Sequence, residues 1–98
     1  MTTGFPGKKK PKADGRLLAA FLNRPAHEAL IRLKGSKRRA IDKFIDYLSD
    51  NPFEEGDFSE YDKVGRIVHC KIIRDLAITY YADHAVKELK VIELVATP

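Results

Sequence analysis

The chain has 98 residues, of which 44% are hydrophobic and 33% are charged, and its formal net charge is +4. This length and composition predict one soluble globular domain. The single cysteine excludes an intramolecular disulfide and suits a reducing compartment. No apolar run approaches the roughly 20 residues needed to cross a bilayer, so we expect a cytoplasmic protein without a membrane partner.

The positive charge is concentrated in the first half of the chain. Residues 1–50 carry 12 Lys/Arg and 5 Asp/Glu, whereas residues 51–98 carry 6 and 9. A basic half favours binding to a polyanion such as nucleic acid, and a solvated surface explains it equally well. Residues 1–14 contain four lysines, two prolines and two glycines, which predicts a disordered basic arm. The single domain is then expected over residues 15–98.

Two helices are predicted in the first half. The apolar run over residues 16–22 precedes them and is expected to be a strand or a buried helical segment. Pro25 favours a helix start, and Gly35 followed by Ser36 favours a helix end and the N-cap of a second helix. Pro52 ends that second helix, because the residue before a proline is pushed out of the α region. Its apolar face has the spacing i, i+3, i+4, i+7 and comprises Ile41, Phe44, Ile45 and Leu48.

The second half is predicted to contain an acidic loop and three strands. The loop covers residues 51–62. We expect three aromatic side chains to pin it to the domain, namely Phe53, Phe58 and Tyr61. Runs of β-branched and aromatic residues predict strands over residues 66–73, 76–82 and 89–95. The predicted fold is therefore α+β with the order β-α-α-β-β-β, a helical hairpin packed on one face of a small, mainly antiparallel sheet.

Alternation along the strand 66–73 divides its side chains between two faces. The set assigned to the core comprises Val68, Cys70 and Ile72. Cys70 then behaves as a small hydrophobe and is separated from its neighbour His69, which lies on the opposite face. One cysteine and three scattered histidines do not supply the ligand spacing of a zinc site, so neither a metal nor another cofactor is expected.

The face opposite the core carries groups suited to metal-independent RNA cleavage. The paired strand is expected to place Tyr81 beside His69 and Lys71. A histidine titrates near neutrality and can act as acid or base, while cations stabilise the phosphorane. The candidate catalytic residues are His69, Lys71, Arg74 and Tyr81. The candidate RNA-binding residues are Arg66, Lys63 and Lys71. A half-solvated antiparallel sheet with a polar outer face explains the same pattern without any activity.

Three strings and the predicted order of elements carry a family resemblance. The strings are FIDYLSDNPF, GRIVHCKII and AITYYADHAVKELKVIEL. Together, over about residues 16–95, they resemble the RelE/ParE superfamily of type II toxins. The string ITYYADHAVKEL is particularly similar to a RelE-type branch described as cytotoxic translational repressors. The resemblance implies a RelE-like toxin domain and a cognate antitoxin protein as its partner.

The resemblance implies more than one activity. Family members that cleave mRNA in the ribosomal A site use basic residues on the central strands, with an Arg and a Tyr or His near the C-terminus. Lys71 falls on the matching strand, whereas Ala77 stands where many members have an arginine, and only Ala-Thr-Pro follows the last predicted strand. Three functions stay open: a toxin that cleaves ribosome-bound mRNA, a ParE-like toxin that binds DNA gyrase without an enzyme site, and a degenerate homologue that mainly binds its antitoxin.

Overall fold

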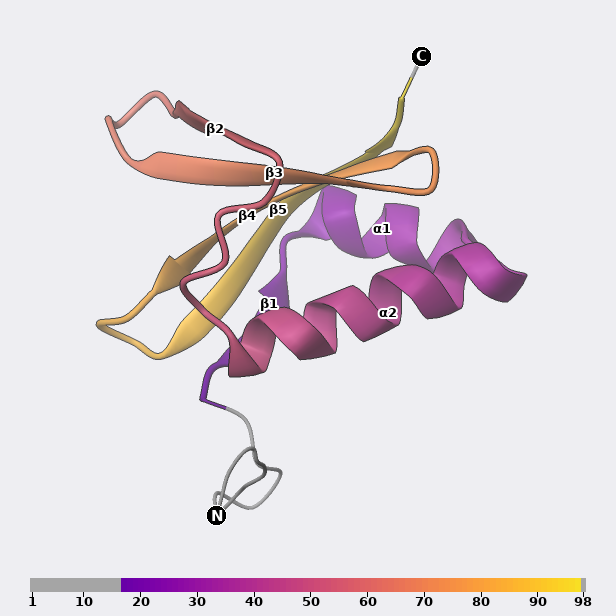
Figure 1. The fold of residues 1–98 in the computed structure, drawn as a ribbon, viewed down its shortest axis with the longest axis horizontal. Helices are drawn as coiled ribbons and strands as arrows, with labels where there is room; N and C mark the ends of the chain where they lie inside the picture. The colour runs from indigo at the N-terminus through magenta and orange to yellow at the C-terminus, as the bar shows by residue number, and fades with distance from the viewer. Residues whose placement is uncertain (1–16, 98) are drawn as a thin grey trace.

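Seven helices and strands follow one another in the computed structural model, which describes residues 17–97 (Figure 1). They are β1 (Ala19–Leu22), α1 (Arg24–Arg32), α2 (Gly35–Asp50), β2 (Phe58–Tyr61), β3 (Ile67–Ile73), β4 (Leu76–Asp83) and β5 (Glu88–Ala96). The predicted arm over residues 1–14 lies outside the described residues. Within residues 17–97, no helix is both long and apolar enough to span a membrane.

The strands form one five-stranded sheet in the order β1-β5-β4-β3-β2. β1 runs parallel to β5, and the other neighbouring pairs are antiparallel. Both helices lie on the same side of this sheet (Figure 1), where they pack chiefly against β5 and β1. The α+β class, the helical hairpin on one face and the mainly antiparallel sheet are therefore confirmed.

The predicted loop over residues 51–62 contains a strand that the sequence analysis missed. β2 pairs with β3 at the edge of the sheet, and all four of its residues are exposed. The aromatic side chains expected to pin the loop are in fact exposed, with 81% of Phe53, 51% of Phe58 and 72% of Tyr61 accessible. The Tyr80 hydroxyl holds this segment instead, because it donates a hydrogen bond to the Glu54 carbonyl at 3.1 Å.

The helix boundaries follow from their caps. α1 begins beside Pro25 as predicted, and the Asn23 side chain accepts a hydrogen bond from the Ala26 amide at 3.0 Å. α2 begins at Gly35, whose φ is 62°, and no side chain caps it. The prediction that Ser36 is the N-cap is wrong, and its hydroxyl instead accepts a hydrogen bond from the Arg74 guanidinium at 3.2 Å.

The core lies between α2 and the central strands. Of the predicted apolar face of α2, Phe44 is half-buried and the other three residues are buried, as expected. The strands contribute a row of buried side chains, which comprises Leu76, Ile78 and Tyr80 of β4 and Leu89, Val91 and Leu94 of β5. These residues define the face of the sheet that the helices cover.

The faces of β3 are the reverse of those predicted. Lys71 is paired with Ile78 and His69 with Tyr80, and directly paired residues share a face of the sheet. His69 and Lys71 therefore lie on the helix side, and Cys70 and Ile72 lie on the opposite face. Cys70 is buried there, whereas 37% of Ile72 is exposed. Val68 and Cys70 are buried, as predicted, but on the face away from the helices. The prediction that the helices cover this set is wrong, because β4 fixes the register of β3 and the helices pack chiefly on β5 and β1.

Candidate active site and basic surface

His69 lies in the middle of β3, held between the edge strand and the core. Its Nδ1 atom is 3.0 Å from the Ser59 hydroxyl, which β2 places directly opposite in the ladder. Its ring packs beside the ring of Tyr80 with the centroids 5.7 Å apart. Within residues 17–97, no hydrogen bond reaches Nε2. The imidazole is thus oriented through one nitrogen while the other is available for proton transfer.

Lys71 shares this face, two residues further along β3, which places its Cα about 7 Å from that of His69. Its ammonium group is 3.4 Å from Oδ1 of Asp57. The other carboxylate oxygen, Oδ2, accepts a hydrogen bond from the Ile72 amide at 2.8 Å. The hydrogen bond from the Ile72 amide, with a smaller effect of the Lys71 ammonium group, holds the pKa of the Asp57 carboxyl below its usual range. The cation is thus paired loosely with an anion that the backbone of β3 fixes in place.

Tyr81 lies on the opposite face from this pair, together with Arg66. The Arg66 guanidinium is 3.9 Å from the centroid of the Tyr81 ring and 2.6 Å from the Asp62 carboxylate. Tyr81 follows Tyr80 directly in β4, and neighbouring strand residues point to opposite sides. The prediction that Tyr81 shares a face with His69 and Lys71 is therefore wrong.

Arg74 and Lys63 lie in turns at opposite ends of β3. Arg74 adopts a φ of 60° in the turn that joins β3 to β4. Lys63 lies exposed in the turn between β2 and β3. Arg66 and Arg74 are eight residues apart, or about 26 Å along an extended strand, so they cannot contact one phosphate. Of the predicted site residues, the structure brings His69 and Lys71 together on the helix side of the sheet, and Arg66 and Tyr81 together on the other side.

Two buried groups beside this site are unsuited to ionise near neutral pH. Burial raises the pKa of the Cys70 thiol, which suits a small hydrophobe rather than a nucleophile. Burial, with Glu54 nearby, also raises the pKa of the Tyr80 hydroxyl. Within the described part of the chain, no three His, Cys, Asp or Glu side chains form a group able to hold a metal ion.

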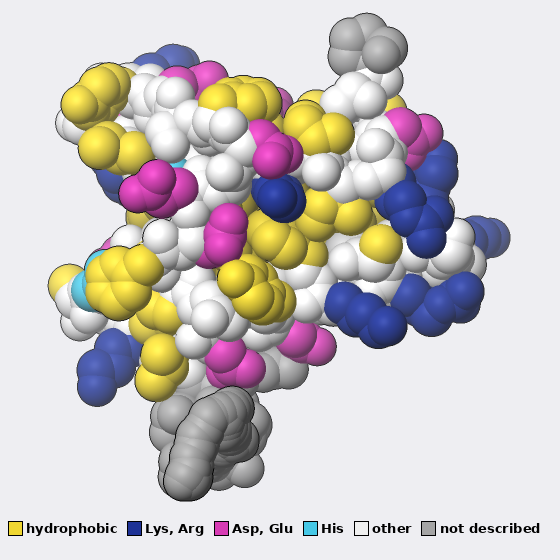
Figure 2. Space-filling view, in the orientation of Figure 1, with side chains coloured by type: hydrophobic (Ala, Val, Ile, Leu, Met, Phe, Trp, Pro, Cys, Tyr) yellow, Lys and Arg dark blue, Asp and Glu magenta, His cyan; other side chains and the backbone are white. Residues whose placement is uncertain are grey.

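A basic surface lies at the end of the molecule where α1, α2 and the turn between β3 and β4 meet. Figure 2 shows Lys and Arg side chains gathering over this end. We define the basic surface by the residues Arg32, Lys34, Lys37, Arg38, Arg39, Lys43 and Arg74. Lys37 is paired with Asp75 at 2.9 Å and Arg38 with Asp42 at 3.1 Å. The excess of cations leaves a surface suited to a phosphate backbone.

The predicted RNA-binding residues, which are Arg66, Lys63 and Lys71, lie outside this surface, whereas the predicted catalytic residue Arg74 belongs to it. The string KGSKRR, residues 34–39, was a direct signal of it. The turn predicted over residues 34–37 is shorter in the structure, because α2 begins at Gly35 and carries Lys37, Arg38 and Arg39 in its first turns.

Comparison with known proteins identifies the fold. No protein-family model matches the chain. No curated protein matches it in sequence either. A chain of the archaeal RelE–RelB complex from Pyrococcus horikoshii OT3 superimposes with a TM-score of 0.66 at 18% identity, covering 82% of this chain and 94% of that one. A chain of the toxin–antitoxin complex RelBE2 from Mycobacterium tuberculosis gives 0.65 at 14% identity, covering 81% and 96%.

The chain is an α+β protein with two helices packed on a five-stranded, mostly antiparallel sheet. More narrowly, it has the fold of RelE-like toxins, as the resemblance in sequence implied.

Proposed function

We propose that this chain is the toxin of a type II toxin–antitoxin pair, and that it inhibits translation in the cytoplasm by cleaving mRNA on the ribosome. The observation that carries the proposal is the likeness in fold. Both similar structures are toxin–antitoxin complexes, and the alignments cover 94% and 96% of the matched chains. The same likeness supports a cognate antitoxin protein as the partner.

The proposed chemistry uses His69 and Lys71. The 2′-hydroxyl of the RNA attacks the adjacent phosphorus, so that the 2′-O–P bond forms while the 5′-O–P bond breaks. His69 takes the proton of the attacking hydroxyl or supplies one to the departing 5′-oxygen. Lys71 leaves Asp57 and stabilises the negative charge of the phosphorane. The products are a 2′,3′-cyclic phosphate and a free 5′-hydroxyl.

RNA binding is assigned mainly to the basic surface. Arg74 belongs to this surface and also lies at the end of the strand that bears His69 and Lys71. Its role is therefore to hold a flanking phosphate rather than to transfer a proton. Arg66, Lys63 and Tyr81 lie away from this pair, and we retain them as secondary contacts to RNA.

The test is expression of the chain with and without its antitoxin, combined with mapping of ribosome-bound mRNA by primer extension. We expect growth arrest that the antitoxin relieves, and new mRNA 5′ ends within the ribosomal A site. His69→Gln and Lys71→Gln should each lower cleavage by about 100-fold or more. His84→Gln is the matched control, because His84 stacks on Phe53 outside the site. Growth arrest with intact mRNA would refute the nuclease assignment.

A second candidate is a non-enzymatic toxin that binds DNA gyrase. The observation that favours it is the division of the predicted catalytic groups, with Tyr81 on one face of the sheet and His69 and Lys71 on the other. A supercoiling assay separates the candidates, since inhibition of gyrase with intact mRNA supports this one. A degenerate homologue that mainly binds its antitoxin would cause no growth arrest at all.

A further inference from the structure

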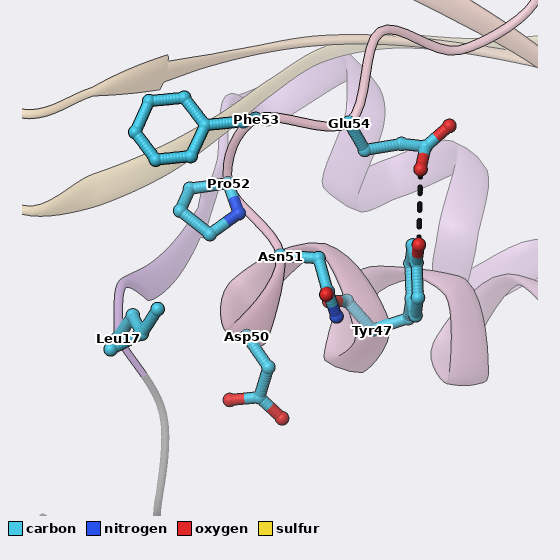
Figure 3. A pocket seen from close by; sticks show the side chains of 7 residues that line it. All are labelled: Leu17, Tyr47, Asp50, Asn51, Pro52, Phe53 and Glu54. Carbon is cyan, nitrogen blue, oxygen red and sulfur yellow. Dashed lines mark hydrogen bonds between the residues drawn. The ribbon is translucent and has the colours of Figure 1, made fainter. Parts of the chain in front are cut away.

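A pocket of about 360 Å³ lies at the C-terminal end of α2, away from the basic surface. It is lined by Leu17, Tyr47, Asp50, Asn51, Pro52, Phe53 and Glu54. Figure 3 shows Leu17, Pro52 and Phe53 on one side, and the hydrogen bond from the Tyr47 hydroxyl to the Glu54 carboxylate on the other. The pocket thus combines apolar surface with carboxylates.

The apolar part of this pocket is unusually exposed. The accessible fraction is 81% for Phe53, 52% for Leu17 and 47% for Tyr47. The Phe53 ring stacks on the His84 ring, with the centroids 5.1 Å apart. Neighbouring exposed aromatic and aliphatic side chains of this kind mark surfaces that another segment covers.

The chain around the pocket is strongly acidic. Residues 44–62 contain seven Asp or Glu and no Lys or Arg. Residues 1–16 have the opposite character, with four lysines, one arginine and one aspartate. The lysines lie close together, at positions 8, 9, 10 and 12. The two segments are therefore complementary in charge.

The connection between the segments is short. The amides of Leu17 and Leu18 donate hydrogen bonds to the Ser49 carbonyl at 3.2 and 3.0 Å. This fastens the end of the N-terminal segment beside Asp50. Lys12 is five residues before Leu17, which limits its distance from that anchor to about 17 Å. Such a tether gives an effective concentration in the millimolar range, so even a weak contact is populated.

We propose that residues 8–12 of the same chain dock in this pocket. The lysine ammonium groups bind the carboxylates of Asp50 and Glu54, and the lysine stems cover the exposed rings of Phe53 and Tyr47. This inference concerns a contact within the chain and does not depend on toxin activity. It assigns the lysines to the acidic end of the molecule and leaves polyanion binding to the basic surface at the other end.

Disulfide trapping in the full chain tests the contact. In a Cys70→Ser background, Lys12→Cys is combined with Asn51→Cys in the pocket. The matched control combines Lys12→Cys with Val86→Cys, because Val86 is also exposed and lies in the turn that contacts the start of β1 through the Lys87 carbonyl. We expect the pocket pair to form its disulfide about tenfold faster at low salt, and this preference to shrink at 1 M salt, where the Debye length is about 3 Å. Equal rates for the two pairs, or a preference insensitive to salt, would overturn the proposal.

A second measurement avoids new cysteines. The NMR spectrum of the full chain is compared with that of a variant in which lysines 8, 9, 10 and 12 are replaced by glutamine. The proposal predicts shifts at Tyr47, Phe53 and Glu54, and no shifts at Lys37 or Arg39 on the basic surface. Asp50→Asn with Glu54→Gln should produce the same loss of contact. Unchanged pocket resonances, or pocket shifts that scale with protein concentration and so reveal a second copy, would contradict it.

Discussion

His69 lies directly opposite Tyr80 in the ladder between β3 and β4, and the two rings pack with their centroids 5.7 Å apart. Tyr80 is only 1% exposed, so a core residue supports one side of the imidazole. The hydroxyl of the same tyrosine donates to the Glu54 carbonyl at 3.1 Å. One residue thus connects the core, the candidate site and the segment between α2 and β2.

Replacement of Tyr80 by phenylalanine should destabilise the fold and loosen this segment. The variant leaves the Glu54 carbonyl without its donor, which costs about 1 to 2 kcal/mol of the free energy of unfolding. Urea unfolding measures this change. Tyr47→Phe is the matched control, because it also removes a hydroxyl bound to Glu54 but at an exposed position. Equal effects of the two variants would show that the Tyr80 bond has no special structural role.

Gly56 should tolerate alanine much less well than Gly65. Both have positive φ, at 73° and 82°, so both replacements carry backbone strain. A Cβ at Gly56 would lie 2.6 Å from the Cys70 carbonyl oxygen, whereas nothing lies within 4 Å at Gly65. Gly56→Ala must therefore displace the segment that positions Asp57 beside Lys71. We expect the unfolding midpoint in urea to fall further for Gly56→Ala than for Gly65→Ala. Equal midpoints would contradict this contact.

Asp57→Asn should strengthen the binding of RNA to the site around Lys71. The asparagine side chain can still accept the hydrogen bond of the Ile72 amide, but it removes the negative charge beside the ammonium group. Phosphate then no longer competes with a carboxylate for Lys71. Fluorescence anisotropy with a short labelled RNA should show an affinity increase of about two- to fivefold, the modest gain expected when a solvent-exposed ion pair is removed. Asp42→Asn is the comparison variant, because it removes the carboxylate paired with Arg38 and therefore changes the basic surface and not the site around Lys71.

Stability should fall in acid through three aspartates, namely Asp57, Asp62 and Asp75. The Ile72 amide lowers the pKa of Asp57, and the Lys37 ammonium lowers the pKa of Asp75. For Asp62, desolvation raises the pKa, but hydrogen bonds from Arg66 and Val64 outweigh it and the net pKa is lowered. Groups with a lowered pKa in the folded state stabilise it fully above their unfolded value of about 3.9, and lose this contribution as pH falls through the folded value.

Thermal unfolding between pH 6 and pH 2 checks this expectation. The melting temperature should fall steadily below about pH 4. In the Asp75→Asn variant, the melting temperature should decrease less between pH 4 and pH 2 than in the unmodified chain. A melting temperature independent of pH over this range would refute the assignment.

Cations of the basic surface should contribute to RNA binding through counterion release. Arg39→Gln and Lys43→Gln should each reduce the dependence of log affinity on log salt by about one unit or less, without changing sequence preference. Lys87→Gln is the control, because Lys87 lies in the turn between β4 and β5. If Arg39→Gln and Lys43→Gln reduce the slope of log affinity against log salt only as much as Lys87→Gln does, the basic surface does not bind RNA.

Much of the fold followed from local patterns. The face containing Ile41, Ile45 and Leu48 and the helix start at Pro25 depend on spacing and on proline chemistry, so they were predicted correctly. β2 was missed because its sequence, Phe-Ser-Glu-Tyr, lies within an acidic stretch and is exposed on every residue. Its strand conformation comes from hydrogen bonds to the free edge of β3, which no local pattern records.

In the candidate site, too, some features follow from the local sequence pattern and others depend on contacts between distant segments. Alternation alone established that His69 and Cys70 point to opposite faces and that His69 and Lys71 share one, and both statements hold in the structure. Which face meets the helices was decided elsewhere, by the register that pairs His69 with Tyr80 and by the packing of the helices on β5 and β1. The two-residue period of a strand determines which of its side chains share a face. Which of the two faces the helices cover depends on contacts between segments far apart in the chain. That is why the sequence determined the neighbours within β3, and only the tertiary structure separated Tyr81 from them.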